Sequence, residues 1–155
     1  MPQEIERKFL VNPERWAAAE KPPGRFLRQG YILTDPHKTI RVRIAGESAC
    51  LTIKGISTGA VRAEYEYPIP VADAEELLDA YAAVCITKNR YRVEAGGKTW
   101  DVDEFLAENE GLTVAEIELT HEHETFERPD WLGQEVTEDK RYYNSNLSLT
   151  PFRSW

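Results

Sequence analysis

The sequence predicts an α+β domain built around an eight-stranded antiparallel β-barrel, or tunnel, with a charged interior and short helices on its flanks. Eight short segments alternate charged with apolar residues, and three or four short helical segments lie among them. The apolar faces of these strands are large enough to need a cover. A sheet closed into a ring accounts for the alternating strands, the short helices and the covered apolar faces. Its charged face lines the lumen while its apolar face packs against helices.

Eight segments read as strands because polar and apolar residues alternate along them, which places the two kinds on opposite faces. In chain order these segments are residues 4–11, 25–33, 39–44, 49–55, 61–69, 86–94, 99–102 and 114–120. The turn after the second strand starts at Asp35-Pro36, a dipeptide that favours turn initiation. Gly96-Gly97 predicts a hairpin between the sixth and seventh strands.

The helical segments are short and are recognised by their first residues. Asn12 as N-cap and Pro13 at the first helical position predict a helix over residues 13–19. Asp73, with a glutamate three residues later, resembles a capping box, and apolar residues then recur at helical spacing as far as Cys85. Three further candidates are a short helix over 103–109, a turn or helical piece at 131–133 and a last helix within 139–149.

Composition limits the classes of function. The 155 residues fit one domain, 1–155, and 27 acidic against 19 basic residues give a net charge of −8, which argues against nucleic-acid binding. A small polyanion is not excluded, because cations can cluster locally. Cys50 and Cys85 read as reduced thiols, and the absence of a leader-like start or a long apolar run predicts a cytoplasmic protein without a membrane span. The oligomeric state stays open, a homodimer included.

The informative feature is that the predicted strands carry charge on one face only. The cations on this face are Lys8, Arg41, Arg43, Lys54, Arg62, Lys88, Arg90 and Arg92. The anions are Glu4, Glu6, Glu64, Glu66, Asp101, Asp103, Glu116 and Glu118. Neighbouring like charges destabilise a sheet, so bound ions of both signs would compensate for them. An ordinary solvated face is the plainer interpretation, although such faces usually mix uncharged polar residues among the charges, and from the residues alone both interpretations stay open.

The first predicted strand contains a motif that resembles the signature of a known family. Glu4-Ile5-Glu6-Arg7-Lys8 matches the E-x-E-x-K signature of the CYTH superfamily, the triphosphate tunnel metalloenzymes. Later segments follow in the order of that family: 41–43, 51–55, 64–66, 88–90 and 115–119. The end of the chain, 131–137 and 141–147, resembles the short bacterial members. The resemblance therefore covers nearly the whole chain.

The resemblance implies an enzyme that hydrolyses inorganic tripolyphosphate with a divalent metal, Mg²⁺ or Mn²⁺. It places metal-binding acids at Glu4, Glu6, Asp103, Glu116 and Glu118, and phosphate-binding cations at Lys8, Arg41, Arg43, Lys54, Lys88 and Arg90. These residue types suit the chemistry, because hard cations prefer carboxylates and guanidinium groups clamp phosphate. Asp101, Arg62, Arg92 and Lys140 match less closely.

The catalytic candidates from the same comparison are Lys8, Glu4 and Glu6, and the group that orients the attacking water is Glu64, Glu66 or Lys8. Alternatives within the family are adenylate cyclase of class IV, thiamine triphosphatase and hydrolysis of nucleoside triphosphates. A module that binds polyphosphate or nucleotide without catalysis is the alternative from another class. The four acids of the two Glu-x-Glu pairs, at 4 and 6 and at 116 and 118, weigh against that alternative, because simple binding does not need them.

Strand parity bears on the substrate. Tyr65, Tyr67, Tyr91 and Trp100 fall between the charged positions and are expected to point outward, so the lumen lacks an obvious aromatic surface for a nucleobase. We therefore expect tripolyphosphate to be preferred over ATP. Tyr31, Tyr142 and Tyr143 leave open a base site at one opening. The pair His121 and His123 is expected in an exposed turn rather than at a metal.

Overall fold

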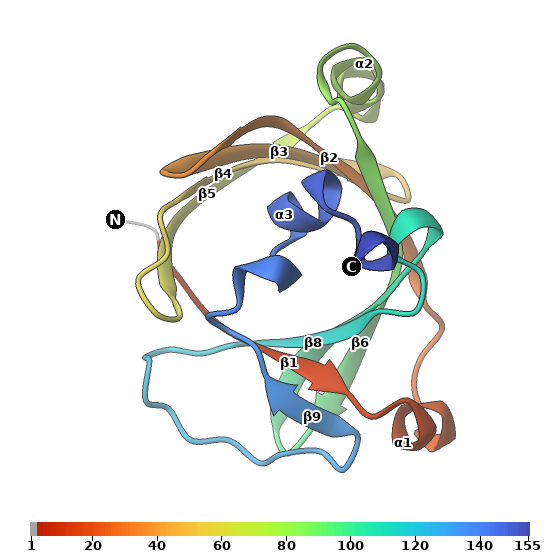
Figure 1. The fold of residues 1–155 in the computed structure, drawn as a ribbon, viewed down its shortest axis with the longest axis vertical. Coiled ribbons are helices and arrows are strands. Elements are labelled where there is room, and N and C mark those ends of the chain that lie inside the picture. The colour runs from red at the N-terminus through yellow and green to blue at the C-terminus, as the bar shows by residue number, and fades with distance from the viewer. Residues whose placement is uncertain (1–2) are drawn as a thin grey trace.

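The computed structural model describes residues 3–155, and its strands form one antiparallel sheet that curls into a ring (Figure 1). The strands are β1 Gln3–Val11, β2 Arg25–Asp35, β3 Lys38–Ala45, β4 Ser48–Gly55, β5 Val61–Ile69, β6 Cys85–Ala95, β7 Lys98–Phe105, β8 Thr113–Glu118 and β9 Leu132–Glu135. The helices are α1 Pro13–Ala18, α2 Val71–Tyr81 and α3 Asn144–Leu149, with 3₁₀ turns η1 Ala107–Asn109, η2 Lys140–Tyr142 and η3 Phe152–Ser154.

Eight of the described strands make the ring, in the order β5-β4-β3-β2-β6-β7-β8-β1, and β1 pairs back onto β5. This closing pairing is short and joins Gln3 to Ala63, Glu4 to Arg62 and Ile5 to Val61. Beyond Ile5 the first strand leaves β5, and β9 takes that side of it. The predicted eight-stranded antiparallel ring is confirmed, although so short a closure falls short of a regular barrel.

Of the segment predicted as a turn or helical piece at residues 131–133, Trp131 is in a turn as predicted, but Leu132 and Gly133 belong to the additional strand β9. Its residues Leu132 and Glu135 pair with Val11 and Phe9 of β1. The pattern of four residues is too short to predict a strand, and the free edge of β1 decides its conformation. A strand on that edge also protects unpaired backbone groups from other chains.

Two helix boundaries also differ from the sequence-based expectation. The segment predicted as a helix over 103–109 continues β7 through Phe105, and only the turn η1 is helical. The longer helix begins at Val71 with Pro70 as its N-cap, and no side chain caps it, so the expected capping box at Asp73 is wrong. Asp73 lies in the first turn, where its charge favours the helix dipole.

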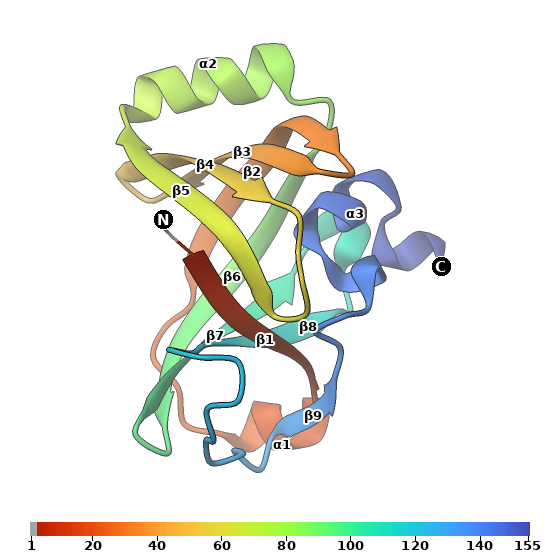
Figure 2. The ribbon, with the colours of Figure 1, turned by 90° about the vertical axis from the view of Figure 1, so that its left-hand side faces the viewer.

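Helices α1 and α2 cover the outer face of the ring, α1 at one end and α2 over β2, β3 and β4 (Figure 2). Under α1, the rings of Trp16 and Trp131 meet edge to face at 5.3 Å, and Trp131 meets Trp100 at 5.7 Å. Under α2, Leu78 is 1% exposed and packs with Val42. The prediction that these apolar strand faces point outward to helices is confirmed. Every helix within residues 3–155 is too short or too polar to traverse a bilayer.

The inward face is not charged along its whole length, which corrects the predicted lumen. Further along the charged strands, the same alternation places Val114, Phe105 and Ile86 on the inward face. These residues form one buried cluster with Tyr142 and Leu147 of the C-terminal segment. The inside of the ring therefore has a charged part and an apolar part.

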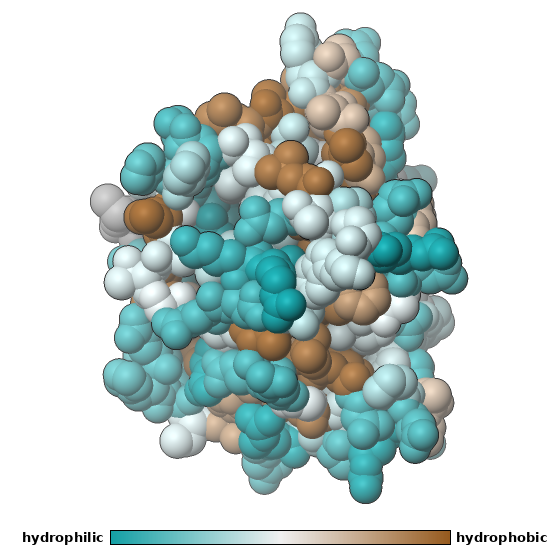
Figure 3. Space-filling view, viewed as in Figure 1, coloured by the Kyte–Doolittle hydropathy of each residue, from teal (hydrophilic) through white to brown (hydrophobic). Residues whose placement is uncertain are grey.

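Helix α3 was expected to cover an outer strand face. It lies instead within the outline of the ring in Figure 1 and at one end of the ring in Figure 2. There it packs against β2 and β6, with Leu147 fully buried. The space-filling view of this face shows side chains across the opening that the ribbon leaves (Figure 3). The C-terminal segment thus closes one end of the ring and leaves a charged pocket behind it.

Candidate active site

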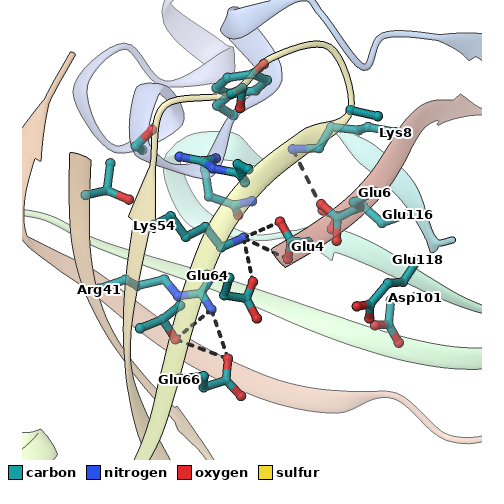
Figure 4. A pocket seen from close by; sticks show the side chains of 18 of the residues that line it. Glu4, Glu6, Lys8, Arg41, Lys54, Glu64, Glu66, Asp101, Glu116 and Glu118 are labelled. Carbon is teal, nitrogen blue, oxygen red and sulfur yellow. Dashed lines mark hydrogen bonds and ion pairs between the residues drawn. The ribbon is translucent and has the colours of Figure 1, made fainter. Parts of the chain in front are cut away.

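A pocket with a volume of about 220 Å³ occupies the charged part of the ring, and polar side chains dominate its lining. Figure 4 shows how these side chains converge from several strands. Strand register explains the convergence, since directly paired residues share one face: Lys8 lies opposite Glu116, and Glu6 lies opposite Glu118. Because side chains alternate along a strand, Glu4, Glu6 and Lys8 of β1 reach the same cavity as Glu116 and Glu118 of β8.

Eleven of the predicted site residues line this one pocket: Glu4, Glu6, Lys8, Arg41, Arg43, Lys54, Glu64, Glu66, Arg90, Glu116 and Glu118. Three of the looser matches, Arg62, Arg92 and Asp101, line it as well, whereas Lys140 does not. Lys88 and Asp103, predicted as a phosphate ligand and a metal ligand, are also missing from the lining. Their side chains are sealed beneath the pocket floor.

Lys88 and Asp103 form a buried ion pair with a Nζ–Oδ2 distance of 2.8 Å, at 0% and 1% side-chain exposure. Both carboxylate oxygens of Asp103 also accept hydrogen bonds from Arg90, at 2.7 and 2.9 Å. Burial lowers the pKa of Lys88 to about 8 despite the neighbouring Asp103 carboxylate. Lys88 also donates to Asn144 Oδ1 at 3.0 Å. The pair therefore contacts Arg90 and α3 and lies outside the pocket lining, so the expected roles of Lys88 and Asp103 stay predictions.

Asp103→Asn is expected to lower the free energy of unfolding by about 3–5 kcal/mol, because it leaves the buried Lys88 charge without its partner. The melting temperature should fall by about 10 °C for a chain of this length. Asp130→Asn is the matched control, since the Asp130–Arg15 pair is exposed and contributes within about 1 kcal/mol. Denaturant unfolding of both variants measures the difference, and equal stabilities would contradict the structural role of Asp103.

The structure adds lining residues to the predicted charged set, and two of them, Tyr31 and Tyr143, enter the sequence-based prediction only as a base site. Thr39, Thr52 and Tyr31 line the pocket, and strand parity could have found them, because each is in phase with Arg41 or Lys54 or lies opposite one of them. Four others come from the C-terminal part of the chain: Thr137, Tyr143, Asn144 and Ser145. No strand pattern marks those four, so only the folded chain places them in the pocket.

On one wall of the pocket, Lys54 is held between two acids. Its Nζ donates to Glu4 at 3.0 and 3.2 Å and lies 3.4 Å from Glu64 Oε2. Burial alone would lower the pKa of Lys54, but the charges of Glu6 and Glu4 raise it above its ordinary value. Burial and the bond to Glu4 raise the pKa of Glu64 to about 7. On this wall, Lys54 therefore stays positively charged, whereas the nearby Glu4 and Glu64 make it harder for both carboxyl groups to be ionised at once.

A second acidic pair lies on β1 and β8. Burial, followed by the charges of Glu116 and Glu4, raises the pKa of Glu6 well above its ordinary value. Burial opposes ionisation of Glu116 too, but Lys8, Arg90 and the hydrogen bond with Glu6 lower its pKa to about 2. Two carboxyl groups in contact, such as Glu6 and Glu116, do not readily ionise together unless a cation lies between them.

Three arginines, Arg41 and Arg43 of β3 and Arg90 of β6, line the pocket on the strands that follow Lys54 around the ring. The side chain of Arg43 makes no hydrogen bond or ion pair with any residue in 3–155, and burial together with the charges of Arg41 and Arg90 lowers its pKa. Arg41 is 8% exposed, and its Nη2 lies 3.4 Å from Thr52 Oγ1 and 4.0 Å from Glu66. Its Nε is buried without a partner among the described residues. Such unsatisfied guanidinium donors indicate a binding surface for an anion.

Lys8 lies on β1 beside the acids of the pocket, directly opposite Glu116 of β8. Its Nζ donates to the backbone oxygen of Tyr142 at 3.1 Å and is 3.8 Å from Glu116 Oε1. His121 and His123 lie in an exposed turn just after β8, as expected, and neither lines the pocket. Within residues 3–155, no three potential metal ligands already surround a single point.

Comparison with known proteins adds a family to this geometry. The model of the CYTH domain matches residues 2–151. A protein of Acetivibrio thermocellus named inorganic triphosphatase is 49% identical over 156 residues, covering 100% of this chain and 99% of the relative. A second protein of that name, from Nitrosomonas europaea, is 38% identical over 155 residues, with coverages of 95% and 97%.

Solved structures agree with these relatives. A crystal structure described as an inorganic triphosphatase has a TM-score of 0.65 and 34% identity, and the match covers 96% of either chain. A putative adenylate cyclase from Bacillus halodurans has a TM-score of 0.63 at 16% identity, covering 79% of this chain and 84% of the other. The second likeness is one of fold alone.

Proposed function

This chain belongs to the CYTH domain family, and from that premise we propose that it is a divalent-metal-dependent triphosphatase that hydrolyses inorganic tripolyphosphate. One observation carries the proposal: a single pocket has a wall of arginines, Arg43 among them with no partner in residues 3–155, and facing carboxyl groups on β1 and β8. A triphosphate with a bound cation presents complementary charges to both. The similarity to two relatives named inorganic triphosphatase supports the choice of substrate.

The cationic wall binds the phosphate chain. Arg43 and the free donors of Arg41 face the pocket and can each offer two N–H groups to one phosphate. Arg90 lines the pocket too, although Asp103 already holds two of its nitrogens, so it contributes its charge more than new bonds. Lys54 contributes a further positive charge between Glu4 and Glu64. Together these groups neutralise the substrate and hold it in one orientation.

The acidic wall suits a hard divalent cation, Mg²⁺ or Mn²⁺. Its donors are carboxylate oxygens, the ligands these ions prefer, and a bound cation would relieve the repulsion that helps to raise the pKa of Glu6 beside Glu116. We assign Glu4, Glu6, Glu116 and Glu118 as the residues that would hold the metal. When bound, such an ion neutralises charge on the phosphate oxygens during transfer. Asp103 is left out, since Lys88 and Arg90 occupy its oxygens.

The reaction adds water across one terminal phosphoanhydride bond. The water oxygen bonds to the terminal phosphorus, the bridging P–O bond breaks, and the products are orthophosphate and pyrophosphate. Lys8, with its Nζ between Tyr142 and Glu116, is placed to donate to a phosphate oxygen of the substrate. Glu64 and Glu66 line the pocket beside Lys54 and Arg41, and we propose them as the groups that orient the water.

Removal of divalent metal is expected to abolish this hydrolysis. The acidic wall repels a polyanion, and the organic cations alone leave that repulsion in place. Phosphate release should cease in the presence of EDTA and return when Mg²⁺ or Mn²⁺ is added in excess. Undiminished turnover by thoroughly chelated protein would contradict the assignment of the metal.

Tripolyphosphate is expected to have a higher kcat/KM than ATP or thiamine triphosphate. Tyr67 and Trp100 point outward as predicted, and of the three tyrosines left open for a base site, Tyr31 and Tyr143 line the pocket. Tyr142 is buried in the apolar cluster and offers no base site. A substrate made only of phosphate uses the charges without needing a place for a base.

Parallel kinetics on the three substrates, with product analysis, tests the proposed function against its alternatives. Orthophosphate from tripolyphosphate supports the proposal, and a preference for thiamine triphosphate redirects it within the family. Cyclic AMP formed from ATP indicates the cyclase reaction. Binding of all three without turnover indicates a module without catalysis.

A further inference from the structure

Tyr143 reaches the pocket from outside the strands of the ring. It is the residue between η2 and α3, in the segment that closes one end of the ring. Its side chain nevertheless lines the pocket among the charged residues. Its hydroxyl donates to the backbone oxygen of Thr137 at 3.3 Å, and this bond holds the hydroxyl end of the tyrosine side chain in place.

Two cations of the pocket lie over the aromatic ring of Tyr143. The Nζ of Lys8 is 5.3 Å from the ring centroid, and the Cζ of Arg62 is 6.0 Å from it. Arg62 is itself oriented by two hydrogen bonds to the Gly55 oxygen, at 3.2 and 2.9 Å. One aromatic side chain thereby contacts cations from β1 and β5.

The same segment also holds the rest of Lys8. Its backbone N–H donates to Thr137 Oγ1 at 3.0 Å, and its backbone oxygen accepts from Val136 at 2.8 Å. Its Nζ donates to the oxygen of Tyr142. The position of Lys8 therefore depends on the C-terminal segment at both ends of its side chain.

An aromatic ring has a different effect on an ammonium group from that of a carboxylate. The ring face attracts a cation without accepting one of its strong hydrogen bonds and without cancelling its charge. A carboxylate in the same place would compete with the phosphate oxygens for those N–H groups. A ring beside Lys8 and Arg62 can thus fix both cations while their donors stay available to an anion.

We propose that Tyr143 is a positioning residue that acts through its aromatic ring on Lys8 and Arg62, so that the C-terminal segment sets the donors presented to the triphosphate. This inference rests on the proposed function for its kinetic consequence. The two ring contacts, rather than the hydroxyl, carry the effect.

Tyr143→Leu and Tyr143→Phe separate the ring from the hydroxyl. Tyr143→Leu should lower kcat/KM for tripolyphosphate by about tenfold or more, since it removes contacts to two partly desolvated cations. Tyr143→Phe keeps the ring and should recover activity to within about threefold of the native enzyme. Equal losses in the two variants would overturn the role of the ring.

Trp155→Leu is the control for loosening of the C-terminal segment. Trp155 packs edge to face on Tyr142 at 5.2 Å and lies outside the pocket lining. If the segment matters only as packing, Trp155→Leu and Tyr143→Leu should reduce activity equally at equal loss of melting temperature. A larger loss in Tyr143→Leu supports the proposal, and equal losses refute it.

A double-mutant cycle with Lys8→Ala tests whether Tyr143 acts through Lys8. The penalty of Tyr143→Leu should shrink at least threefold once Lys8 is gone, whereas an unchanged penalty overturns the proposal. The same cycle is measured on the dissociation constant of tripolyphosphate in EDTA, by calorimetry. That readout needs no turnover. If the native protein showed no triphosphatase activity, the proposed function would be refuted, and the binding cycle would still decide the role of Tyr143.

Discussion

Glu6→Gln is expected to lower kcat for tripolyphosphate by about 100-fold to 1000-fold at saturating Mg²⁺. The amide removes one anionic donor from the acidic wall, and charge neutralisation by a catalytic metal contributes several kcal/mol to the transition state. The metal concentration needed for half of the remaining activity should rise. Initial rates over a metal titration measure both changes.

The protein should stay folded in this variant. Glu6 lies opposite Glu118 and beside Glu116, so loss of its charge relieves repulsion between carboxylates and keeps the side-chain shape. Glu75→Gln is the matched control, because Glu75 is exposed on α2, away from the pocket. A thermal melt that shows Glu6→Gln unfolded would assign Glu6 a structural role, and native metal dependence in a folded variant would remove it from the metal site.

Arg43→Ala is expected to lower kcat/KM for tripolyphosphate by at least about 100-fold, with a higher KM and a lower kcat. A guanidinium that clamps phosphate in both the ground state and the transition state contributes to both constants, and charged hydrogen bonds are the strong ones. Arg43 has no competing partner in residues 3–155, so its donors are free for the substrate. Steady-state kinetics over a wide range of tripolyphosphate concentration separates the two constants.

The stability of Arg43→Ala gives an independent check. Burial and the charges of Arg41 and Arg90 lower the pKa of Arg43, so removal of its charge should keep or raise the melting temperature. Arg28→Ala is the matched control: Arg28 lies on β2 and pairs with Asp79 of α2 at 2.9 Å, outside the pocket. Similar kinetic losses in the two variants would show that Arg43 has no special role in binding.

Much of this site follows from the period of a β-strand. Successive side chains point to opposite faces, so the spacing of Glu4, Glu6 and Lys8 and that of Arg41 and Arg43 already place them together on an inward face. The same rule sends Trp100 outward, where α1 covers it. Local residue order therefore predicts the ring, its charged interior and most of the pocket lining.

Alternation determines the face of a residue but not its depth along the ring. Asp103 and Asp101 share a face, yet Asp101 lines the pocket while Asp103 is buried beneath it against Lys88. Two residues further, the inward face of the same strand carries Phe105 in an apolar cluster. Strand register and tilt set that depth, and both depend on pairings between distant parts of the chain.

The C-terminal segment is the other feature that only the tertiary structure decided. Its sequence predicts a helix, and α3 is one, but nothing local to residues 144–149 says that Leu147 will fill the end of the ring rather than cover its outside. That choice depends on Ile86, Phe105 and Val114, which leave an apolar surface open at that end. Tyr143 is only four positions before Leu147 in the chain. Burial of Leu147 at the end of the ring therefore brings Tyr143 to Lys8. The sequence thus determined which residues face inward, and long-range packing of apolar surface determined which of them reach the pocket.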